Sequence, residues 1–338
     1  MEKTMEEQNI FIEKYKNKNN EEKIRKFIRG KLLNKGSFSK TYEFINQENF
    51  HISAGKIFPK IKNDNKDNKD NKDNKVKKNY FLCEKNILKN LHHPNILNLE
   101  HFFEDSENSY LLLEFCVYGN LGELLNERKK LTELEVKYYL FQIVNALKYL
   151  RNNKIIHRNL KLENILISDK MNIKLSGFHL ATRLKSEKEK KSLKLGSPNY
   201  IAPEVINITD NGYSYEVDIW ALGVIIYFLI IGKPPFGTKT IEETYQNIKI
   251  GKYSFPEDSK ISENAKDLIE KLLLVDPNKR LKLDEILNHN FLKLNINIPK
   301  TLPEYTLKEP PKIEFIKQYE QDNKYTINLN NGKKKYYR

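Results

Sequence analysis

The octapeptide HRNLKLEN at residues 157–164, followed by GFH at residues 177–179, is the most informative part of this chain. Upstream, residues 27–58 alternate apolar and polar side chains around a turn that contains a glycine, a pattern typical of paired strands. Downstream of Leu121, apolar residues recur at helical spacing, and Thr132 with Glu135 three residues later predicts a capping box at the start of a helix. A strand-rich part and a helix-rich part, joined near residues 114–119, predict a molecule with two lobes.

The octapeptide belongs to a series of short segments that follow one another in a fixed order. The other members are Asn34–Ser39 with Gly36, Ala54-Gly55-Lys56, Glu84, Gly177-Phe178-His179, Ala202-Pro203-Glu204, Asp218-Ile219-Trp220 and Asp276-Pro277 with Arg280. With these segments the chain resembles the eukaryotic protein kinases over about residues 27–292. The resemblance implies an α+β, two-lobed protein kinase fold, with a small antiparallel sheet and one helix in the N-lobe and a larger helical C-lobe. It also implies a buried ion pair between Glu204 and Arg280, and an Asp218 side chain that anchors the backbone of the octapeptide.

A closer resemblance is to the polo-like kinases. It is carried by RGKLLNKGSFSKTYEF (29–44), AGKIFPK (54–60), LTELEVKYYLFQIV (131–144), GSPNYIAPEV (196–205) and GKPPF (232–236), and by Leu302-Pro303 and Pro310-Pro311 at the spacing of the polo-type linker. A polo-like kinase continues after this linker with polo-box modules that bind phosphopeptides. The segment after Pro311 is too short for them, so we expect a kinase domain and linker without polo boxes, recruited through other contacts.

Composition and repeats predict where the lobes begin and end. Residues 1–22 are charged and sparsely apolar, which predicts a disordered tail. An Asn-Lys-Asp repeat without apolar residues predicts a disordered, low-complexity insert over residues 60–79. We expect the N-lobe at residues 23–116 around this insert, the C-lobe at residues 117–295, and the polo-type linker with a basic tail at residues 296–338.

Overall composition excludes several classes of protein. The 338 residues carry a formal net charge of +14, but lysine is spread along the whole chain, which favours a solvated surface over a nucleic-acid site. The longest apolar run, Ile219–Ile231, is shorter than the about 20 residues that span a bilayer, so it predicts a buried core helix. Two cysteines, Cys83 and Cys116, make no disulfide framework and favour an intracellular, cytoplasmic or nuclear location.

The kinase resemblance implies residues that bind ATP. Lys56 is expected to reach the α- and β-phosphates while paired with Glu84, and Gly36 is the one glycine left of three in the phosphate-binding loop. Asn34 and Ser39 replace the other two, so we expect weakened nucleotide binding. The adenine pocket implied by the resemblance consists of Leu33, Thr41, Ala54, Leu166 and the linker strand residues Glu114 and Cys116.

Two positions that do the family's chemistry differ in this chain. Asn159 stands where the family has its catalytic aspartate, and a neutral amide can orient a substrate hydroxyl but cannot accept its proton. General-base assistance is worth roughly 10²–10⁴ in rate. Gly177 replaces the aspartate that binds Mg²⁺, which leaves Asn164 as the remaining metal position and Lys161 beside the γ-phosphate. We therefore expect Mg²⁺ to be held weakly or not at all.

No replacement for these groups is evident in the sequence. There is no acidic residue between Asp169 and Glu187, and His179 with Asn164 would suit a softer ion than Mg²⁺. The position of the regulatory phosphothreonine is Leu193, with Ser192 next to it. The lysines around it form either a solvated surface or a patch for an acidic partner.

The first hypothesis is a polo-like serine/threonine kinase homologue with little or no phosphotransfer. Such a protein would act as a scaffold or allosteric regulator of protein partners, an active kinase or a phosphorylation substrate among them, with ATP contact optional. The alternative is an active kinase that transfers the γ-phosphate of ATP to protein hydroxyls through Lys56, Lys161 and Asn164 in an unusual metal arrangement. A third, less favoured class is a charge-driven binder of nucleic acid or membrane surfaces.

Overall fold

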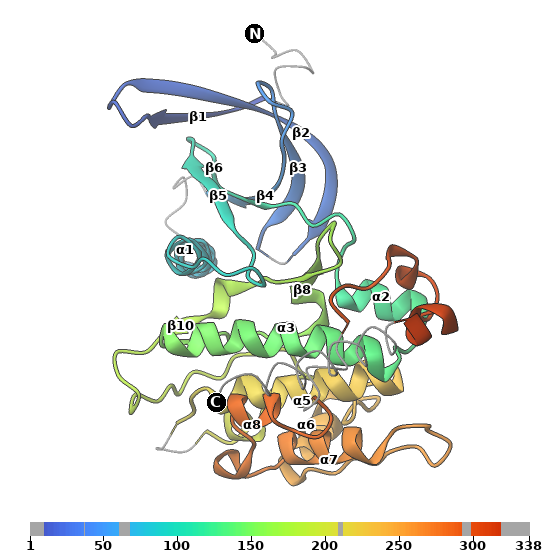
Figure 1. Cartoon of the computed structure of the whole chain (residues 1–338). Coiled ribbons are helices and arrows are strands. Elements are labelled where there is room, and N and C mark those ends of the chain that lie inside the picture. Colours follow the sequence, from blue (N-terminus) through green and yellow to red (C-terminus); the bar gives the residue numbers. More distant parts are fainter. Residues whose placement is uncertain (1–9, 37, 61–67, 209–211, 293–298, 319–338) are drawn as a thin grey trace, which may run out of the picture. The chain divides into compact units, whose positions relative to one another are not determined.

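The computed structural model describes residues 10–36, 38–60, 68–208, 212–292 and 299–318 (Figure 1). The chain forms two compact units. The first unit comprises the chain up to Val117 together with Gly177–Ala181, and the second comprises Tyr118–Ser176 and the chain from Thr182 onward.

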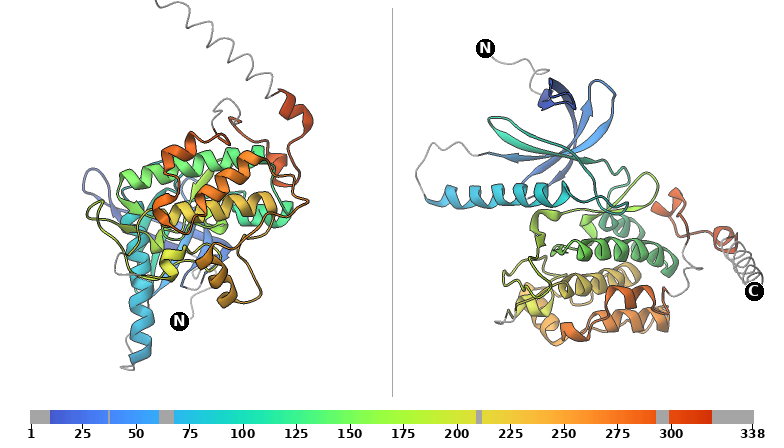
Figure 2. Two further views of the ribbon diagram at one scale, coloured as in Figure 1. Left: turned by 90° about the horizontal axis from the view of Figure 1, so that it is seen from below. Right: turned by 60° about the vertical axis from the view of Figure 1, so that its left-hand side comes forward.

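The first unit is an antiparallel sheet with one long helix. Its strands are β1 (Ile10–Lys16), β2 (Glu22–Lys35), β3 (Lys40–Asn46), β4 (Ile52–Pro59), β5 (Leu99–Glu104) and β6 (Asn108–Glu114), in the spatial order β1-β2-β3-β4-β6-β5. Helix α1 (Asn68–Leu88) runs alongside this sheet and contacts β4, β5 and β6 (Figure 2). The strand-like pattern expected between Phe27 and Phe58 is therefore confirmed.

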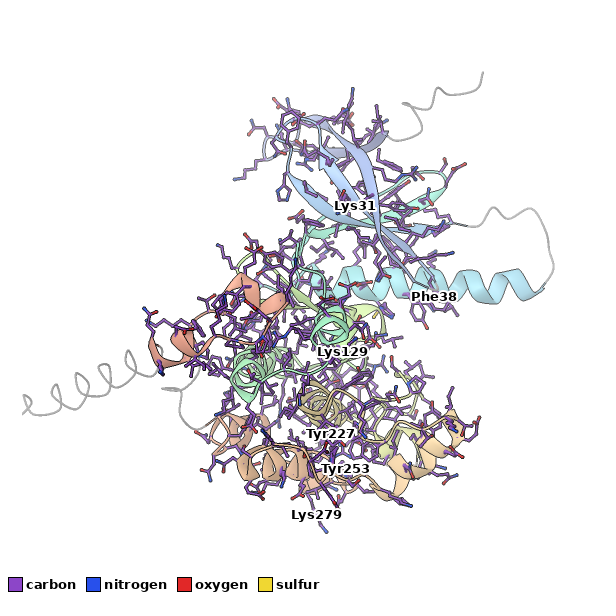
Figure 3. The ribbon with its side chains drawn as sticks, turned by 90° about the vertical axis from the view of Figure 1, so that its right-hand side faces the viewer. Lys31, Phe38, Lys129, Tyr227, Tyr253 and Lys279 are labelled. Atoms are coloured by element: carbon purple, nitrogen blue, oxygen red, sulfur yellow. The ribbon has the colours of Figure 1, made fainter. Side chains whose placement is uncertain are left out.

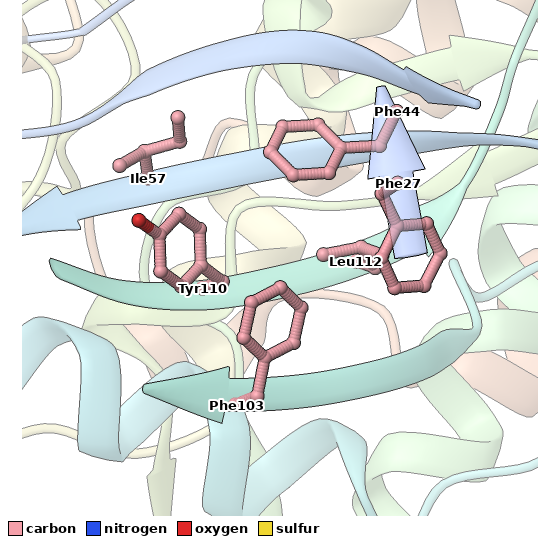
Figure 4. Close-up of a cluster of buried hydrophobic side chains, with 6 residues drawn as sticks. All are labelled: Phe27, Phe44, Ile57, Phe103, Tyr110 and Leu112. Carbon is pink, nitrogen blue, oxygen red and sulfur yellow. The ribbon is translucent and has the colours of Figure 1, made fainter. Parts of the chain in front are cut away.

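Aromatic side chains from four strands form the core of this sheet. The cluster comprises Phe27, Phe44, Ile57, Phe103, Tyr110 and Leu112 (Figure 4). The rings of Phe103 and Tyr110 stack with their centroids 4.6 Å apart. Gly55 on β4 is required by this packing, because a Cβ there would lie 2.1 Å from the Phe44 ring.

The structure differs from the sequence expectation at the N-terminus. Residues 10–22 of the expected disordered tail contain β1, which pairs with β2 in register from Ile10↔Ile28 to Lys16↔Glu22. Phe11 explains the order, because its ring lies 5.0 Å from that of Phe44 and 5.4 Å from that of Tyr110. The many charges of this segment hide an alternation in which every second side chain of β1 is buried or half-buried against the sheet. Residues 1–9 of the expected tail lie outside the described residues.

The expected disordered insert also differs. Residues 68–79 belong to α1, which begins at Asn68, and residues 61–67 lie outside the described residues. Extending a helix that is already nucleated costs far less than starting one. The apolar residues after Val76, among them the buried Phe81 and Leu88, pack α1 against the sheet. The repeat before them contains neither glycine nor proline to stop the helix from extending through it.

The second unit is mainly helical. Its helices are α2 (Leu121–Arg128), α3 (Glu133–Asn152), α4 (Pro203–Ile206), α5 (Glu216–Ile231), α6 (Ile241–Ile250), α7 (Glu263–Leu272) and α8 (Leu283–Leu287). Short antiparallel pairs join β7 (Ile155–Ile156) to β10 (Thr182–Arg183) and β8 (Ile165–Ile167) to β9 (Ile173–Leu175). Single 3₁₀ turns are η2 (Leu162–Asn164), η4 (Pro277–Lys279) and η6 (Glu304–Leu307) here, and η3 (Phe178–Leu180) in the first unit.

Two helix predictions in this unit are confirmed. The Thr132 hydroxyl accepts from the backbone N–H of Glu135, whose carboxylate accepts from the backbone of Thr132, so α3 begins with the expected capping box. Helix α5 is buried along nearly its whole length and contains the apolar run Ile219–Ile231. In the described part of the chain, no helix combines the length and apolar character needed to cross a bilayer.

Candidate functional site

The expected phosphate-binding lysine forms its ion pair. Lys56 on β4 donates from Nζ to Oε2 of Glu84 on α1 over 2.6 Å. The Glu84 side chain is 2 % exposed and that of Lys56 is 16 % exposed, so both charges are largely withdrawn from water. A pair of this kind holds the ammonium at a defined place on the sheet, where it can meet phosphate oxygens.

The turn between β2 and β3 is the expected phosphate-binding loop. The N–H of Gly36 donates to the carbonyl of Ser39 over 2.9 Å and closes the turn. Phe38 from this turn lies beside α1 (Figure 3). Its ring packs edge-on against Tyr80 of α1, with 4.8 Å between centroids. Tyr80 in turn packs against His179 at 5.4 Å. An aromatic stack therefore connects the loop, α1 and η3 within the first unit.

Gly177 and the residues after it are held on α1. The Sγ of Cys83 lies 3.0 Å from the carbonyl oxygen of Ala181 and 3.4 Å from that of Phe178. Gly177 itself has φ +81° and ψ +37°, a left-handed conformation that glycine adopts without strain. The position that carries the metal-binding aspartate in the family thus lacks a carboxylate and has a backbone shape that suits glycine.

The other residues expected to contact a nucleotide belong partly to the first unit and partly to the second. Thr41 pairs with Lys56 across β3 and β4, and Ala54 pairs with Leu113 across β4 and β6, all in the first unit. Leu33 and Glu114 in the same sheet and Cys116 beyond it are half-buried. Leu166 lies on β8 of the second unit, bridged to Asn120.

In the second unit, Asp218 organises the octapeptide. Its carboxylate accepts from the N–H of His157 over 2.8 Å and from that of Arg158 over 2.9 Å, and Arg158 has the unusual φ of +63°. Burial raises the pKa of Asp218 to about 6, although both N–H donors oppose the shift by favouring the ionised form. The expected role of Asp218 as anchor of this loop is confirmed.

The loop is also bonded internally. Asn164 donates from Nδ2 to the carbonyl of Asn159 over 2.7 Å, and the carbonyl of Asn164 accepts from the N–H of Ser176 over 2.8 Å. His157 Nε2 lies 2.8 Å from the carbonyl oxygen of Ser176. Lys161 directly precedes η2. The backbone that presents a catalytic residue in this fold is therefore in place, but the side chain at residue 159 is an amide.

The residues present do not fit Mg²⁺ held as the kinase family holds it. Mg²⁺ prefers carboxylate and water oxygens in octahedral geometry. Gly177 has no side chain, and Asn164, whose Nδ2 donates to the carbonyl of Asn159, offers a metal only its neutral Oδ1. Among the residues that the structure describes, no group of three His, Cys, Asp or Glu side chains is placed to hold a metal ion.

A tyrosine that the sequence did not single out holds the segment around Leu193. Tyr213 donates from its hydroxyl to the carbonyl of Leu193 over 2.6 Å, and Arg158 Nη1 donates to that hydroxyl over 3.3 Å. The backbones of Lys191 and Tyr213 exchange two further hydrogen bonds, of 2.9 and 2.8 Å. Arg158 of the octapeptide is therefore linked to the segment around Leu193 through the Tyr213 hydroxyl.

Two ion pairs support the second unit away from the octapeptide. Arg280 binds Glu204 through two parallel bonds of 2.7 Å with its side chain 1 % exposed, as expected from the sequence. Arg128 pairs with Glu135 at 2.7 Å and also donates to the carbonyl of Thr306. Thr306 is buried, and η6, which lies in the segment expected to be a polo-type linker, packs against α2. No pattern in the sequence indicates this role of Arg128, because Thr306 lies 178 residues away from it in the chain.

Comparison with known proteins places this geometry in a family. Residues 27–292 match the model of the protein kinase domain. The chain is 46 % identical over 310 residues to the probable serine/threonine-protein kinase CCRP1 of Zea mays, covering 92 % of this chain and 48 % of that protein. It is 40 % identical over 290 residues to the serine/threonine-protein kinase polo of Drosophila melanogaster, covering 85 % of this chain and 47 % of that protein. The chain thus spans about half the length of these relatives.

Proposed function

The chain belongs to the protein kinase family, and from this premise we propose that it is a polo-like serine/threonine kinase homologue with little or no phosphotransfer. It acts in this proposal as a scaffold or allosteric regulator of protein partners, in an intracellular setting. The observation that carries the proposal is the pair of substitutions at Asn159 and Gly177, which removes the general base and the principal metal ligand together.

The size of the deficit supports this reading. Loss of the base alone costs roughly 10²–10⁴ in rate, or about 3–5 kcal/mol of barrier. Electrostatic stabilisation of the transferring phosphoryl group is usually the larger contribution. Among the described residues, no group of three His, Cys, Asp or Glu side chains is placed to hold the metal that provides it. What the chain retains is the architecture: the Asp218 anchor, the Arg280–Glu204 pair and the Lys56–Glu84 pair.

The intact Lys56–Glu84 pair also favours retained ATP contact. An ammonium held by a buried carboxylate suits a phosphate without any metal. Phe38 on Tyr80 limits this contact, because the aromatic stack occupies the side of the loop that faces α1. We therefore propose weak, metal-independent nucleotide binding. Stabilisation of the full chain by ATP, equal with and without divalent ions, is the expected result in a thermal unfolding assay.

The phosphotransfer test compares the wild-type chain with three variants. The wild type, Lys56→Met, Asn159→Asp/Gly177→Asp and the triple variant are incubated with labelled ATP, Mg²⁺ or Mn²⁺, and a mixture of serine- and threonine-containing peptides. We expect the wild type to incorporate no more label than Lys56→Met, and the double variant to gain label that the triple variant loses. Incorporation by the wild type that disappears in Lys56→Met would refute the proposal and establish the alternative, an active kinase with an unusual metal arrangement.

A further inference from the structure

The outward side of the β1–β2 hairpin is apolar and basic. Antiparallel pairing places alternate residues on that side, and every one of them is exposed. The cross-strand pairs on this side, hereafter the hairpin face, are Ile10↔Ile28, Ile12↔Lys26, Lys14↔Ile24 and Lys16↔Glu22. The hairpin face therefore carries four isoleucines, three lysines and one glutamate.

The opposite side of the hairpin keeps this face in place. Phe11 packs into the aromatic core of the sheet. Glu13 is 7 % exposed and pairs with Arg25, whose Nη1 lies 3.0 Å from Nδ1 of His101 on β5. Sliding the pairing by one residue would bury lysines and expose these groups. The isoleucines are therefore held in the exposed position by the core beneath them.

The isoleucines form one continuous strip. Successive rows on one face of a strand lie about 7 Å apart, and neighbouring strands about 5 Å apart. Ile10 pairs directly with Ile28 and lies one row from Ile12. Ile28 and Ile24 are both diagonal to Ile12, within the about 7–8 Å at which such side chains still interact. Their exposed fractions are 38, 48, 39 and 53 % for Ile10, Ile12, Ile28 and Ile24. A single exposed isoleucine needs no explanation, but an apolar cluster rimmed by charges marks an interaction site.

We propose that the hairpin face binds an acidic amphipathic helix of a protein partner. The strip is about 14 Å long, the length of about nine helical residues, so it accepts apolar anchors at i, i+3 or i+4, and i+7. Lys14, Lys16 and Lys26 flank the strip and complement Asp or Glu on either side of such an anchor row. β-Branched side chains have few rotamers to lose on binding, which favours a defined contact.

Charge argues against two other occupants. A second copy packed on the same face would place lysines against lysines, which destabilises an isologous dimer. An anionic membrane is bound by clusters of about four to eight basic residues, whereas this face has three lysines, and Glu21 and Glu22 at the hairpin end would meet lipid phosphates. The proposal does not depend on whether the chain transfers phosphate.

The test uses the full chain and two helical peptides. Each is a stapled, fluorescein-labelled peptide with leucines at i, i+4 and i+7, flanked by glutamates in one and by lysines in the other. We expect the glutamate peptide to bind at least tenfold more tightly than the lysine peptide, and Ile12→Thr/Ile24→Thr to weaken it at least tenfold, about 1.4 kcal/mol. Lys14→Glu/Lys26→Glu should reverse the preference between the peptides.

The matched control is Ile241→Thr in the second unit, whose side chain is 53 % exposed, the same fraction as Ile24. It should leave binding unchanged, and all variants should unfold at the wild-type temperature because the altered side chains face solvent. Absent binding, equal binding of both peptides, or binding that survives Ile12→Thr/Ile24→Thr would overturn the proposal. It would also be overturned if the hairpin-face variants abolished binding to phosphatidylserine vesicles or self-association in sedimentation while leaving peptide binding intact.

Discussion

Replacing Tyr213 with phenylalanine should loosen the segment around Leu193 without unfolding the protein. The substitution removes one hydroxyl, which donates to the Leu193 carbonyl at 2.6 Å and accepts from Arg158 at 3.3 Å. The ring of Tyr213 is buried, and phenylalanine can keep its packing. The backbone bonds between Lys191 and residue 213 also remain, so the change isolates the hydroxyl.

The expected magnitude follows from these two contacts. A hydroxyl–carbonyl bond contributes a net amount of about 1 kcal/mol, and a bond to a charged group about 1.5 kcal/mol or more. If both are lost, local opening becomes easier by about 1–2.5 kcal/mol, which is roughly 5- to 60-fold in the opening equilibrium. We expect amide hydrogen exchange at residues 189–196 to accelerate within that range.

Tyr227→Phe is the matched control. Its hydroxyl donates to the Ser254 carbonyl at 2.7 Å, a bond of the same type at another place in the second unit (Figure 3). This variant should lose similar global stability while leaving exchange at residues 189–196 unchanged. Equal protection of that segment in Tyr213→Phe and the wild type would refute the idea that Tyr213 holds it. Acceleration shared by both variants would point to general destabilisation instead.

Three further predictions concern the buried charges. The pKa of Asp218 is raised from 3.8 to about 6, so its stabilising contribution is complete below pH 3.8 and is lost as pH rises through 6. The free energy of unfolding of the wild type, minus that of Asp218→Asn, should therefore fall by roughly 3 kcal/mol across that window. A difference that does not change with pH in urea titrations would contradict this. Lys56→Met leaves Glu84 buried and unpaired, so it should lower the free energy of unfolding in urea by roughly 3–5 kcal/mol. The double variant Lys56→Met/Glu84→Leu should recover most of this loss. An equal loss in the double variant would argue that the lysine acts through packing. Arg128→Met should release the segment near Thr306 from α2 and speed limited proteolysis between residues 299 and 312. Arg183→Met, which removes an exposed hydrogen bond to the Asn153 carbonyl, should not change the rate of cleavage there. Equal cleavage rates in the two variants would contradict the role of Arg128.

Local patterns were sufficient for much of the fold. Strand alternation between Phe27 and Phe58, the capping box at Thr132 and the uniform apolar run at Ile219–Ile231 each depend on neighbours within a few residues. The order of the kinase-like segments then predicted contacts such as Lys56 with Glu84 and Arg280 with Glu204. These contacts could be predicted because the resemblance to the kinases indicated which residues pair, whereas the spacing of the residues in the sequence does not.

Other features depended on which distant segments meet. Residues 10–22 looked like a tail because their charges outnumber their apolar residues, yet burying Phe11 on Phe44 offsets the entropy of ordering the strand. Tyr213 had no motif around it, and it matters because it lies against Arg158, far away in the chain. The helical conformation of the Asn-Lys-Asp repeat likewise differs from the expectation, because its helix continues into apolar residues outside the repeat that pack on the sheet.

The chemical identity of the candidate site was readable from residues alone, since an amide at 159 and a glycine at 177 are the same groups in any fold. Their surroundings were not. The buried carboxylate of Asp218, the tyrosine on Arg158 and the exposed isoleucines of the hairpin face arise from contacts between segments far apart in the chain. Burial and charge pairing are properties of such contacts, because the cost of removing a group from water depends on everything that surrounds it in the folded chain.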